Sequence, residues 1–415
     1  MNKRFSLLLA LCLIFSFALV STASAQNITL WTYPVGNWGN AEAVQVLIDK
    51  FNEVYPDIHV TVELLDYVNG DDQVNTAIEG GQAPDIIFEG PERLVANWGA
   101  KGYMVDLADL WAADYAKEIY PSINEACHNA EGAYYEFPVC MIAHTMAVNK
   151  DLFEAAGALQ YLDEETRTWT PDGFVNAVKA LYDYGQENVG AIFCGGQGGD
   201  QGTRALINNL YGGTFTNPEH TAYTADSEEN VKALELLQSL DGINFDPSIV
   251  GGDEIQLFCN ETLGMAFCWN SAQEINNADK VEFDILPMAF PSDGEPKLQG
   301  GIWGFGIFDN GDPARIEAAK TFVKFMTEDN DIYADAVTTS SYFPVRPIEG
   351  IYDGNDVMTE YSLFMPYMGD YYQVTEGWPQ ARTEWWNMLQ RIGAGGNVAE
   401  EVAVFVENAN AAAAN

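Results

Sequence analysis

The chain has 415 residues, a formal net charge of −42 at pH 7, and an apolar content of 47%. A surface this acidic repels nucleic acid and anionic lipid, which excludes both as partners, and it favours a soluble monomer. The length exceeds that of one ordinary core and predicts two domains of roughly 150–200 residues each. The apolar content is that of a globular protein and excludes a disordered chain.

The first 25 residues have the pattern of a secretory signal peptide. Lys3 and Arg4 give it a positive start, Leu7 to Val20 form an apolar run, and Ala23-Ser24-Ala25 supplies the small residues that a signal peptidase recognises. The apolar run is too short to span a bilayer comfortably, and no later stretch approaches ~18 uninterrupted apolar residues. We therefore expect an exported protein, cleaved near Ala25, that is free in a periplasm or outside the cell.

A lipid anchor is the alternative for the leader, because it contains one cysteine. Cys12 follows Leu11 and lies inside the apolar run. A lipid-modified cysteine directly follows a small residue instead. We therefore interpret Cys12 as part of the signal peptide, and lipidation of Cys12 stays open as the second interpretation.

Predicted strands and helices alternate along the mature chain. The first five, in the order strand, helix, strand, helix, strand, are residues 27–33, 40–55, 58–65, 74–79 and 85–88. A helix then starts at Thr170, the expected N-cap, with Pro171 in its first turn. Further predicted strands are 191–194, 263–269 and 283–286, and further predicted helices are 230–240 and 314–326. This alternation predicts α/β lobes with mainly parallel sheets.

Five cysteines remain after cleavage, and export permits disulfides. Local spacing favours Cys127 with Cys140 and Cys259 with Cys268, each pair across a short turn, which leaves Cys194 over. The alternative is that all five are small buried apolar side chains, since spacing alone cannot fix connectivity. No CxxC occurs and the four histidines are scattered, so we expect no zinc site and no other cofactor.

Catalytic motifs are missing from the sequence. The glycine-rich segment 195–199 lacks the Lys-Ser/Thr of a phosphate-binding loop and the spacing of a dinucleotide fingerprint. Neither GxSxG nor HExxH is present. A pair of glycosidase carboxylates cannot be recognised among 61 acidic residues. The sequence therefore favours a protein that is not an enzyme, with a secreted carbohydrate-active enzyme as an alternative.

Six segments in a fixed order resemble one known family. They are NITLWTY (27–33), FNEVYPDIHVTVE (51–63), AIEGGQAPDIIFEGPERL (77–94), YEFPVCMIAHTMAVNKDLFEAAG (135–157), LQGGIWGFGIF (298–308) with the following EAAKTFVKFM, and SSYFPVRPI (340–348). Together they resemble the extracellular solute-binding proteins of family 1, the carbohydrate and glycerol-phosphate branch of ABC importers. Each segment is weak alone, and the resemblance covers nearly all of the mature chain.

The resemblance implies a two-lobe periplasmic-binding-protein fold of type II, with a ligand cleft between the lobes. On this basis the N-terminal lobe comprises 26–139 plus 304–344, and the C-terminal lobe 140–303 plus 345–415. The family's role is to capture a solute, close around it and deliver it to a membrane permease. No bond is made or broken in these steps.

A sugar offers apolar C–H faces to aromatic rings and hydroxyls to carboxylates and amides. Residues of these types lie at predicted strand ends, where open α/β sheets bind ligands, and in the predicted return crossover. The expected ligand contacts in these segments are Tyr33, Trp38, Glu89, Glu92, Trp269, Asn270, Gly301, Trp303 and Tyr342.

The segment EGWPQARTEWWNMLQRI (376–392) resembles the maltose-binding branch, in which two adjacent aromatics stack on sugar rings. Trp385 and Trp386 occupy those two positions. Arg382 departs from that pattern and resembles the glycerol-phosphate branch, where an arginine after Pro-Gln meets the ligand. The expected ligand is therefore a mono- or oligosaccharide, with sn-glycerol 3-phosphate or a glycerophosphodiester as the alternative. An ion pair is the competing role for Arg382, and core packing is the competing role for each tryptophan.

Overall fold

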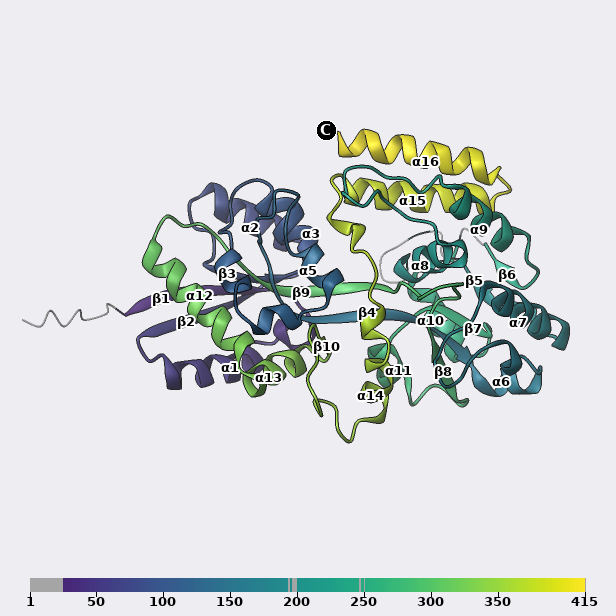
Figure 1. Cartoon of the computed structure of the whole chain (residues 1–415), viewed down its shortest axis with the longest axis horizontal. Helices are drawn as coiled ribbons and strands as arrows, with labels where there is room; N and C mark the ends of the chain where they lie inside the picture. Colours follow the sequence, from purple (N-terminus) through teal and green to yellow (C-terminus); the bar gives the residue numbers. More distant parts are fainter. Residues whose placement is uncertain (1–24, 193–194, 196–199, 246–247, 250, 415) are drawn as a thin grey trace, which may run out of the picture.

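The computed structural model describes residues 25–192, 195, 200–245, 248–249 and 251–414. Figure 1 shows two α/β bodies side by side along the long axis of the molecule. The predicted signal peptide with Cys12 lies outside the described residues, apart from Ala25, and so do Cys194 and residues 196–199 of the glycine-rich segment. Of the described helices, none is both long enough and apolar enough to cross a bilayer.

One body, which we call the first lobe, carries the N-terminal elements and a later pair of helices (Figure 1). Its elements are β1 (Gln26–Thr32), α1 (Ala41–Val54), β2 (Ile58–Leu64), α2 (Gly70–Glu79), β3 (Ile86–Glu89), α3 (Pro91–Arg93), α4 (Ala108–Trp111), α5 (Pro121–Ala126), α12 (Pro313–Glu328), α13 (Asn330–Ser340) and β10 (Phe343–Pro344).

The other body, the second lobe, carries the middle of the chain and its C-terminal helices (Figure 1). Its elements are α6 (Lys150–Ala155), α7 (Pro171–Tyr184), β5 (Gly190–Ala191), α8 (Asp200–Tyr211), α9 (Glu228–Ser239), β6 (Ile243–Asn244), α10 (Gly251–Cys259), β7 (Met265–Trp269), α11 (Ser271–Asn277), β8 (Ile285–Met288), α14 (Asp356–Ser362), α15 (Trp378–Gly393) and α16 (Val398–Ala413).

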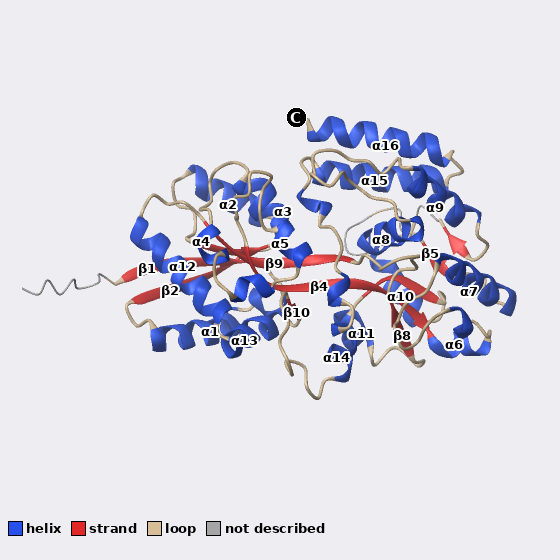
Figure 2. Cartoon of the chain, in the orientation of Figure 1, coloured by secondary structure: helices blue, strands red, loops and turns tan. Residues whose placement is uncertain are grey.

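Two long strands, β4 (Phe137–Asn149) and β9 (Gln299–Ile307), run through both lobes. The hydrogen-bonded order is β10-β4-β9-β3-β1-β2, and β7 and β8 also pair with β4. β1 is parallel to β2 and β3, whereas β4 and β9 are antiparallel to each other and to their other partners. Helices flank the strands (Figure 2). This arrangement confirms the predicted α/β class.

Glycines in β9 let the backbone of β4 approach closely. A Cβ atom at Gly300 would lie 1.7 Å from the carbonyl oxygen of Ile142, and one at Gly304 would lie 2.3 Å from the carbonyl oxygen of Phe137. No side chain fits at such distances. Gly300 and Gly304 of the motif LQGGIWGFGIF are thus explained by the contact between the two shared strands.

A buried aspartate fastens the sheet of the first lobe to its helices. The Asp85 carboxylate accepts hydrogen bonds from the Thr29 backbone N–H (2.8 Å), from Asn310 Nδ2 (2.5 Å) and from Arg315 Nη2 (2.6 Å). Because its side chain is fully buried, these charge-assisted bonds replace the lost hydration. The aspartate of the Pro-Asp-Ile segment therefore has a structural role at the start of β3.

The structure shows that the disulfide interpretation of the cysteines is wrong for the four described ones. Cys127, Cys140, Cys259 and Cys268 are all buried free thiols, so neither predicted disulfide is formed. Cys140 and Cys268 lie on interior strands, and each faces a helix; the Cys268 side chain packs against α8. The thiols fill space in the core as small apolar side chains, which is the alternative that the sequence left open.

Two of the buried glutamates, Glu254 and Glu136, differ in their hydrogen bonds. Glu254 accepts bonds from the backbone N–H groups of Phe267 (2.5 Å) and Cys268 (3.1 Å). Neither carboxylate oxygen of Glu136 has a partner among the described residues. Burial raises the pKa of both carboxyl groups well above the usual range, because the charged form loses its hydration.

The contact between α8 and β7 leaves no space for a side chain at Gly202. A Cβ atom there would lie 2.0 Å from the carbonyl oxygen of Phe267. We expect Gly202→Ala to lower the free energy of unfolding by roughly 1–3 kcal/mol, the usual cost of overpacking, as measured by urea denaturation. The control Gly294→Ala adds a methyl group in open space. Equal stability of both variants would contradict this packing.

The unpartnered Glu136 predicts a pH effect on stability. Since its pKa is raised in the folded state, the folded protein binds the proton more tightly, and stability falls as the pH rises above the usual value of 4.5. Each unit of that shift contributes about 1.4 kcal/mol. Glu136→Gln should therefore lose less stability than the native protein between about pH 5 and about pH 8, when unfolding is followed by urea denaturation. Exposed Glu165→Gln is the control, and a native-like profile for Glu136→Gln would refute the prediction.

Candidate functional site

Arg93 is the centre of a cluster in the first lobe. Its Nη1 donates to Glu89 Oε1 (2.8 Å) and its Nε donates to Asp71 Oδ1 (2.7 Å). The guanidinium lies 5.0 Å from the ring centre of Tyr33 and 5.6 Å from that of Tyr67. The Tyr33 hydroxyl also donates to Asp71. The cluster therefore lies at one rim of the sheet, where the ends of β1 and β3 meet the segment after β2.

This first-lobe cluster is acidic overall and partly closed to water. Burial acts to raise the pKa of Glu89 above its usual range, and the Arg93 charge acts in the opposite direction. Tyr67 is 50% exposed, yet desolvation still raises the pKa of its hydroxyl well above the usual range, with a further contribution from the Glu89 charge. Glu92 belongs to the same cluster, because its Oε1 lies 3.8 Å from Arg93 Nη1 and its charge also acts on Tyr67.

Two aromatic residues meet where β9 leaves the first lobe. Trp303 and Tyr342 stack with ring centres 4.9 Å apart and an interplanar angle of 24°. A Cβ atom at Gly301 would lie 2.1 Å from the Trp303 ring, so the glycine makes room for it. Both rings are partly exposed. The structure thus brings together the predicted residues Gly301, Trp303 and Tyr342.

Asp200, the first residue of α8, is the centre of a cluster in the second lobe. It accepts hydrogen bonds from Arg382 Nε (2.7 Å) and Nη2 (2.6 Å), from Arg204 Nη1 (2.5 Å) and from Trp386 Nε1 (3.2 Å). Arg204 Nε donates to the Tyr372 hydroxyl (2.7 Å). Although burial favours the neutral acid, the two guanidinium groups hold the pKa of Asp200 well below its usual range. The guanidinium of Arg382 is therefore already paired.

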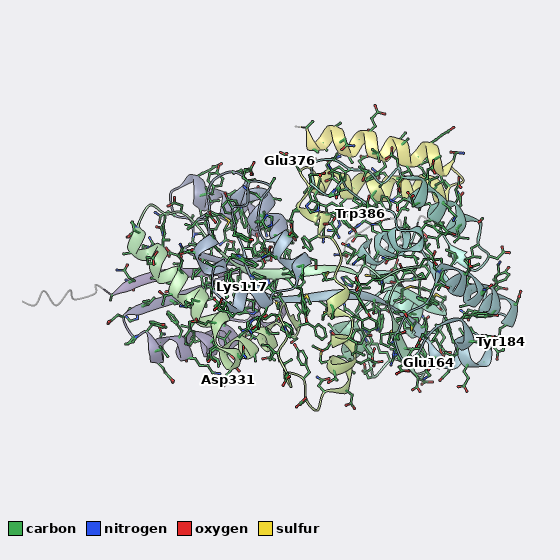
Figure 3. All side chains as sticks on the ribbon, viewed as in Figure 1. Lys117, Glu164, Tyr184, Asp331, Glu376 and Trp386 are labelled. Carbon is green, nitrogen blue, oxygen red and sulfur yellow. The ribbon has the colours of Figure 1, made fainter. Side chains whose placement is uncertain are left out.

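The two adjacent tryptophans of α15 have different surroundings. Trp385 has no exposed surface and packs against Phe215 (5.0 Å between ring centres) and Phe405 (5.2 Å). Trp386 is partly exposed, and the Arg382 guanidinium lies 5.5 Å from its ring centre. Figure 3 labels Trp386 on the part of the second lobe nearest the first. Only Trp386 of the pair offers a ring to a solute.

Two further tryptophans predicted as ligand contacts are core residues in the structure. Trp38 is fully buried, stacks on Phe88 at 4.3 Å and donates its indole N–H to the Ala336 carbonyl (3.1 Å). Trp269 is also fully buried and packs edge-on against Phe258 at 5.2 Å. Burying such large apolar rings is the usual outcome, which corrects the predictions for Trp38, Trp269 and Trp385.

Asn270 is a capping residue. Its Oδ1 accepts a hydrogen bond from the Gln273 backbone N–H (3.0 Å) at the start of α11, and its amide nitrogen lies 3.3 Å from His144 Nδ1. Burial lowers the pKa of His144 to about 4, so the imidazole is neutral at pH 7. The predicted ligand contact at Asn270 is therefore already engaged by protein partners.

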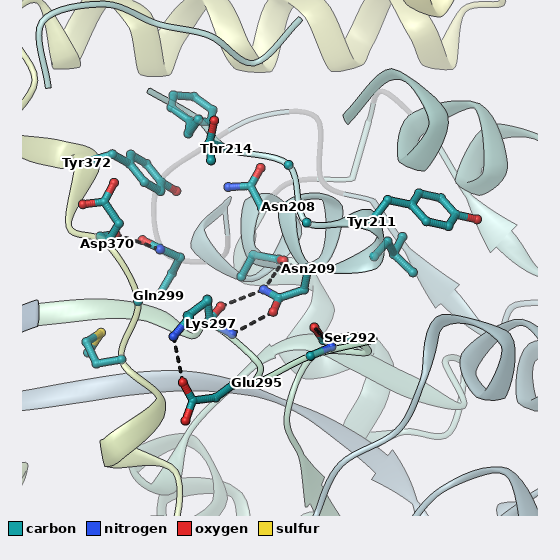
Figure 4. A pocket seen from close by; sticks show the side chains of 18 of the residues that line it. Asn208, Asn209, Tyr211, Thr214, Ser292, Glu295, Lys297, Gln299, Asp370 and Tyr372 are labelled. Carbon is teal, nitrogen blue, oxygen red and sulfur yellow. Dashed lines mark hydrogen bonds and ion pairs between the residues drawn. The ribbon is translucent and has the colours of Figure 1, made fainter. Parts of the chain in front are cut away.

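A hydrogen bond joins the segment before α15 to the first lobe. The Tyr371 hydroxyl donates to Glu92 Oε2 (2.9 Å). The neighbouring residues Asp370 and Tyr372 instead line a cavity of about 560 Å³ (Figure 4). None of the predicted ligand contacts lines that cavity. Residues 370–372 thus contact both the cavity and the Glu92 side chain.

The sequence did not single out several residues of these clusters, namely Tyr67, Asp71, Arg93, Asp200, Arg204, Tyr371 and Tyr372. Arg93 directly follows the predicted rim residues Glu89 and Glu92, so its position alone could have indicated it. Asp200 ends a glycine-rich stretch, and its partner Arg382 is 182 positions away. No local pattern indicates such a pair. Within the described ranges, no group of three or more His, Cys, Asp and Glu side chains is arranged to hold a metal ion.

Comparison with solved structures supports the fold. The chain is similar to the sugar-binding protein MalE of Xanthomonas citri (TM-score 0.77, 14% identity, 94% of this chain and 98% of that chain). It is similar to the cyclic alpha-maltosyl-1,6-maltose binding protein of Arthrobacter globiformis (0.76, 19%, 93% and 98%). It is also similar to an ABC transporter solute-binding protein of Thermotoga lettingae bound with alpha-D-tagatose (0.65, 20%, 94% and 100%).

Sequence comparison identifies the family. An uncharacterized lipoprotein of Streptomyces antibioticus is 28% identical over 141 residues, which is 32% of this chain and only 30% of the length of that relative. The family model for the bacterial extracellular solute-binding protein matches residues 37–331, well over half of the chain. The chain therefore belongs to the bacterial extracellular solute-binding protein family.

Proposed function

We propose that this protein captures a neutral, hydroxyl-rich solute, a mono- or oligosaccharide, and delivers it to the permease of an ABC importer. The observation that carries the proposal is the combination of partly exposed aromatic rings with carboxylates at the lobe boundary. Trp303, Tyr342, Tyr67 and Trp386 offer ring faces, and Glu92 offers hydrogen-bond acceptors. Ring faces suit the C–H groups of a sugar, and carboxylates suit its hydroxyls.

Each arginine that could meet a phosphate ester already has a carboxylate partner, although the Asp200 cluster carries two guanidinium groups on one carboxylate. Arg93 is paired with Glu89 and Asp71, and Arg382 is paired with Asp200. An anionic ligand would have to displace a carboxylate from its guanidinium, which costs the energy of a buried ion pair. Glycerol 3-phosphate is therefore the weaker candidate.

Known proteins of similar fold support the same ligand class. Two of the similar solved structures are complexes with alpha-D-tagatose and with ribitol, and a third is a cyclic alpha-maltosyl-1,6-maltose binding protein. In the proposal the protein acts without catalysis, as an exported monomer cleaved near Ala25. Its lobes are 26–139 plus 304–344 and 140–303 plus 345–415, with boundaries inside β4 and β9. The proposed ligand contacts are Tyr67, Glu92, Gly301, Trp303, Tyr342 and Trp386. In the proposal, Tyr33, Glu89 and Arg382 hold these contacts in place.

The two tryptophans of α15 provide a matched test. A sugar from a panel should raise the melting temperature of the native protein without being turned over. Trp386→Ala should weaken its binding at least about tenfold while leaving unfolding close to native, because the ring is lost from the surface. Trp385→Ala should instead cost about 3–5 kcal/mol of stability, because a buried ring leaves a cavity. Fluorescence titration and urea denaturation measure the two effects.

Three results would contradict the proposal. If glycerol 3-phosphate stabilised the native protein and Arg382→Ala abolished that effect, the phosphate-ester alternative would hold. If a glycan were hydrolysed, the protein would be an enzyme. If Trp386→Ala bound every sugar as the native protein does, the ligand site would lie elsewhere.

A further inference from the structure

The cavity of Figure 4 lies outside the proposed ligand site. Its walls come from the C-terminal half of α8 and the turn after it, the loop 292–297, the start of β9 and residues 368–372. Ser122 of α5 lines it from the first lobe. A volume of about 560 Å³ lies within the range of small-molecule sites in proteins. The cavity can therefore hold a solute of mono- to disaccharide size.

Hydrogen bonds and ring stacking hold the walls of the cavity in place. Asn209 Nδ2 donates to the Lys297 carbonyl (2.7 Å), and the Lys297 backbone N–H donates to Asn209 Oδ1 (2.7 Å), as Figure 4 shows. Phe215 stacks on Tyr372 with ring centres 4.6 Å apart. The side of α8 is thus fixed to the start of β9. A ligand would enter a preformed space and would order little of the protein.

The interior of the cavity presents hydrogen-bond acceptors. Asn208 Oδ1 is buried and has no hydrogen-bond partner among the described residues, which is unfavourable for a polar atom. Gln299 Nε2 donates to the Asp370 carbonyl (3.0 Å), which leaves the amide oxygen of Gln299 as an acceptor. The Asp370 carboxylate adds a third acceptor, shared with His220 at 2.6 Å. A ligand that donates hydrogen bonds would satisfy these groups.

The charges around the cavity disfavour an anion. Its one lysine, Lys297, is paired with Glu295 at 2.9 Å, and both side chains are more than 60% exposed. Asp293 and Asp370 add two more carboxylates to the lining. A phosphate or carboxylate would meet net repulsion here.

We infer that this cavity is a second binding site, for a neutral polyhydroxylated solute of mono- to disaccharide size, separate from the site at Trp303 and Trp386. Tyr371 bonds to Glu92 of the proposed site whereas its neighbours Asp370 and Tyr372 line the cavity, and none of the proposed ligand contacts lines it. The inference goes beyond the proposed function, which requires one site only.

Binding stoichiometry tests the inference, with maltose, D-tagatose and ribitol as probes. Equilibrium dialysis of the full mature protein should give close to two equivalents of at least one probe. Asn208→Leu removes the unpartnered acceptor, and Gly294→Trp adds a large ring at the rim of the cavity, at an exposed position where a Cβ atom meets nothing within 4 Å. Each variant should weaken one of the two binding steps at least tenfold. Trp386→Ala should remove the other step.

Exposed Asn276→Leu is the matched control and should bind as the native protein does. If Asn208→Leu does not fold, Gly294→Trp carries the test alone. Native stoichiometry in a folded Gly294→Trp protein overturns the inference, and so does a Trp386→Ala protein that binds none of the three probes. Binding of glucosamine alone to Trp386→Ala would overturn the neutral ligand class. Loss of all binding in the cavity variants, with Trp386→Ala unaffected, would support the cavity and refute the proposed function.

Discussion

The antiparallel pairing of β4 with β9 is the constraint on which the rest of the structure depends. The register from Phe137 opposite Phe305 to His144 opposite Gln299 carries one hydrogen-bonded ladder from the first lobe into the second. This ladder fixes the position of Trp303 at the edge of the first lobe and the position of Gln299 in the wall of the cavity. It is possible only because β9 has glycines where the β4 backbone comes close. The lobes therefore share a framework, and the aromatic and charged side chains are placed by it.

Charge pairing decides what this framework presents to a solute. In each lobe a buried or partly buried guanidinium is held by carboxylates, Arg93 by Glu89 and Asp71, and Arg204 by Asp200. Desolvated cations are stable only with such partners. What remains available to a ligand is a set of ring faces and acceptor oxygens. A site of this kind suits hydroxyl groups, and the strongly acidic surface around it has the same bias against anions.

Local sequence patterns predicted the helices and strands well, because these elements depend on residues that are close in the sequence. The helix after Thr170 begins where its cap and Pro171 indicated, and β1, β2 and β3 lie within a few residues of the predicted strands. Side-chain direction could not be predicted in the same way. Trp385 and Trp386 are adjacent in sequence, and only the packing of α15 on Phe215 and Phe405 decides which ring is buried. The Asp200 cluster was missed because its members come together only in the folded chain.

The Asp200 cluster also limits how the sequence can change over generations. Loss of Asp200 alone would leave Arg204 and Arg382 facing each other without a counter-charge in a buried position. Loss of either arginine would still leave a paired aspartate. Loss of one arginine should therefore be tolerated more easily than loss of Asp200. A change at Asp200 would also affect Trp386, because the Trp386 indole N–H donates a hydrogen bond to the Asp200 carboxylate.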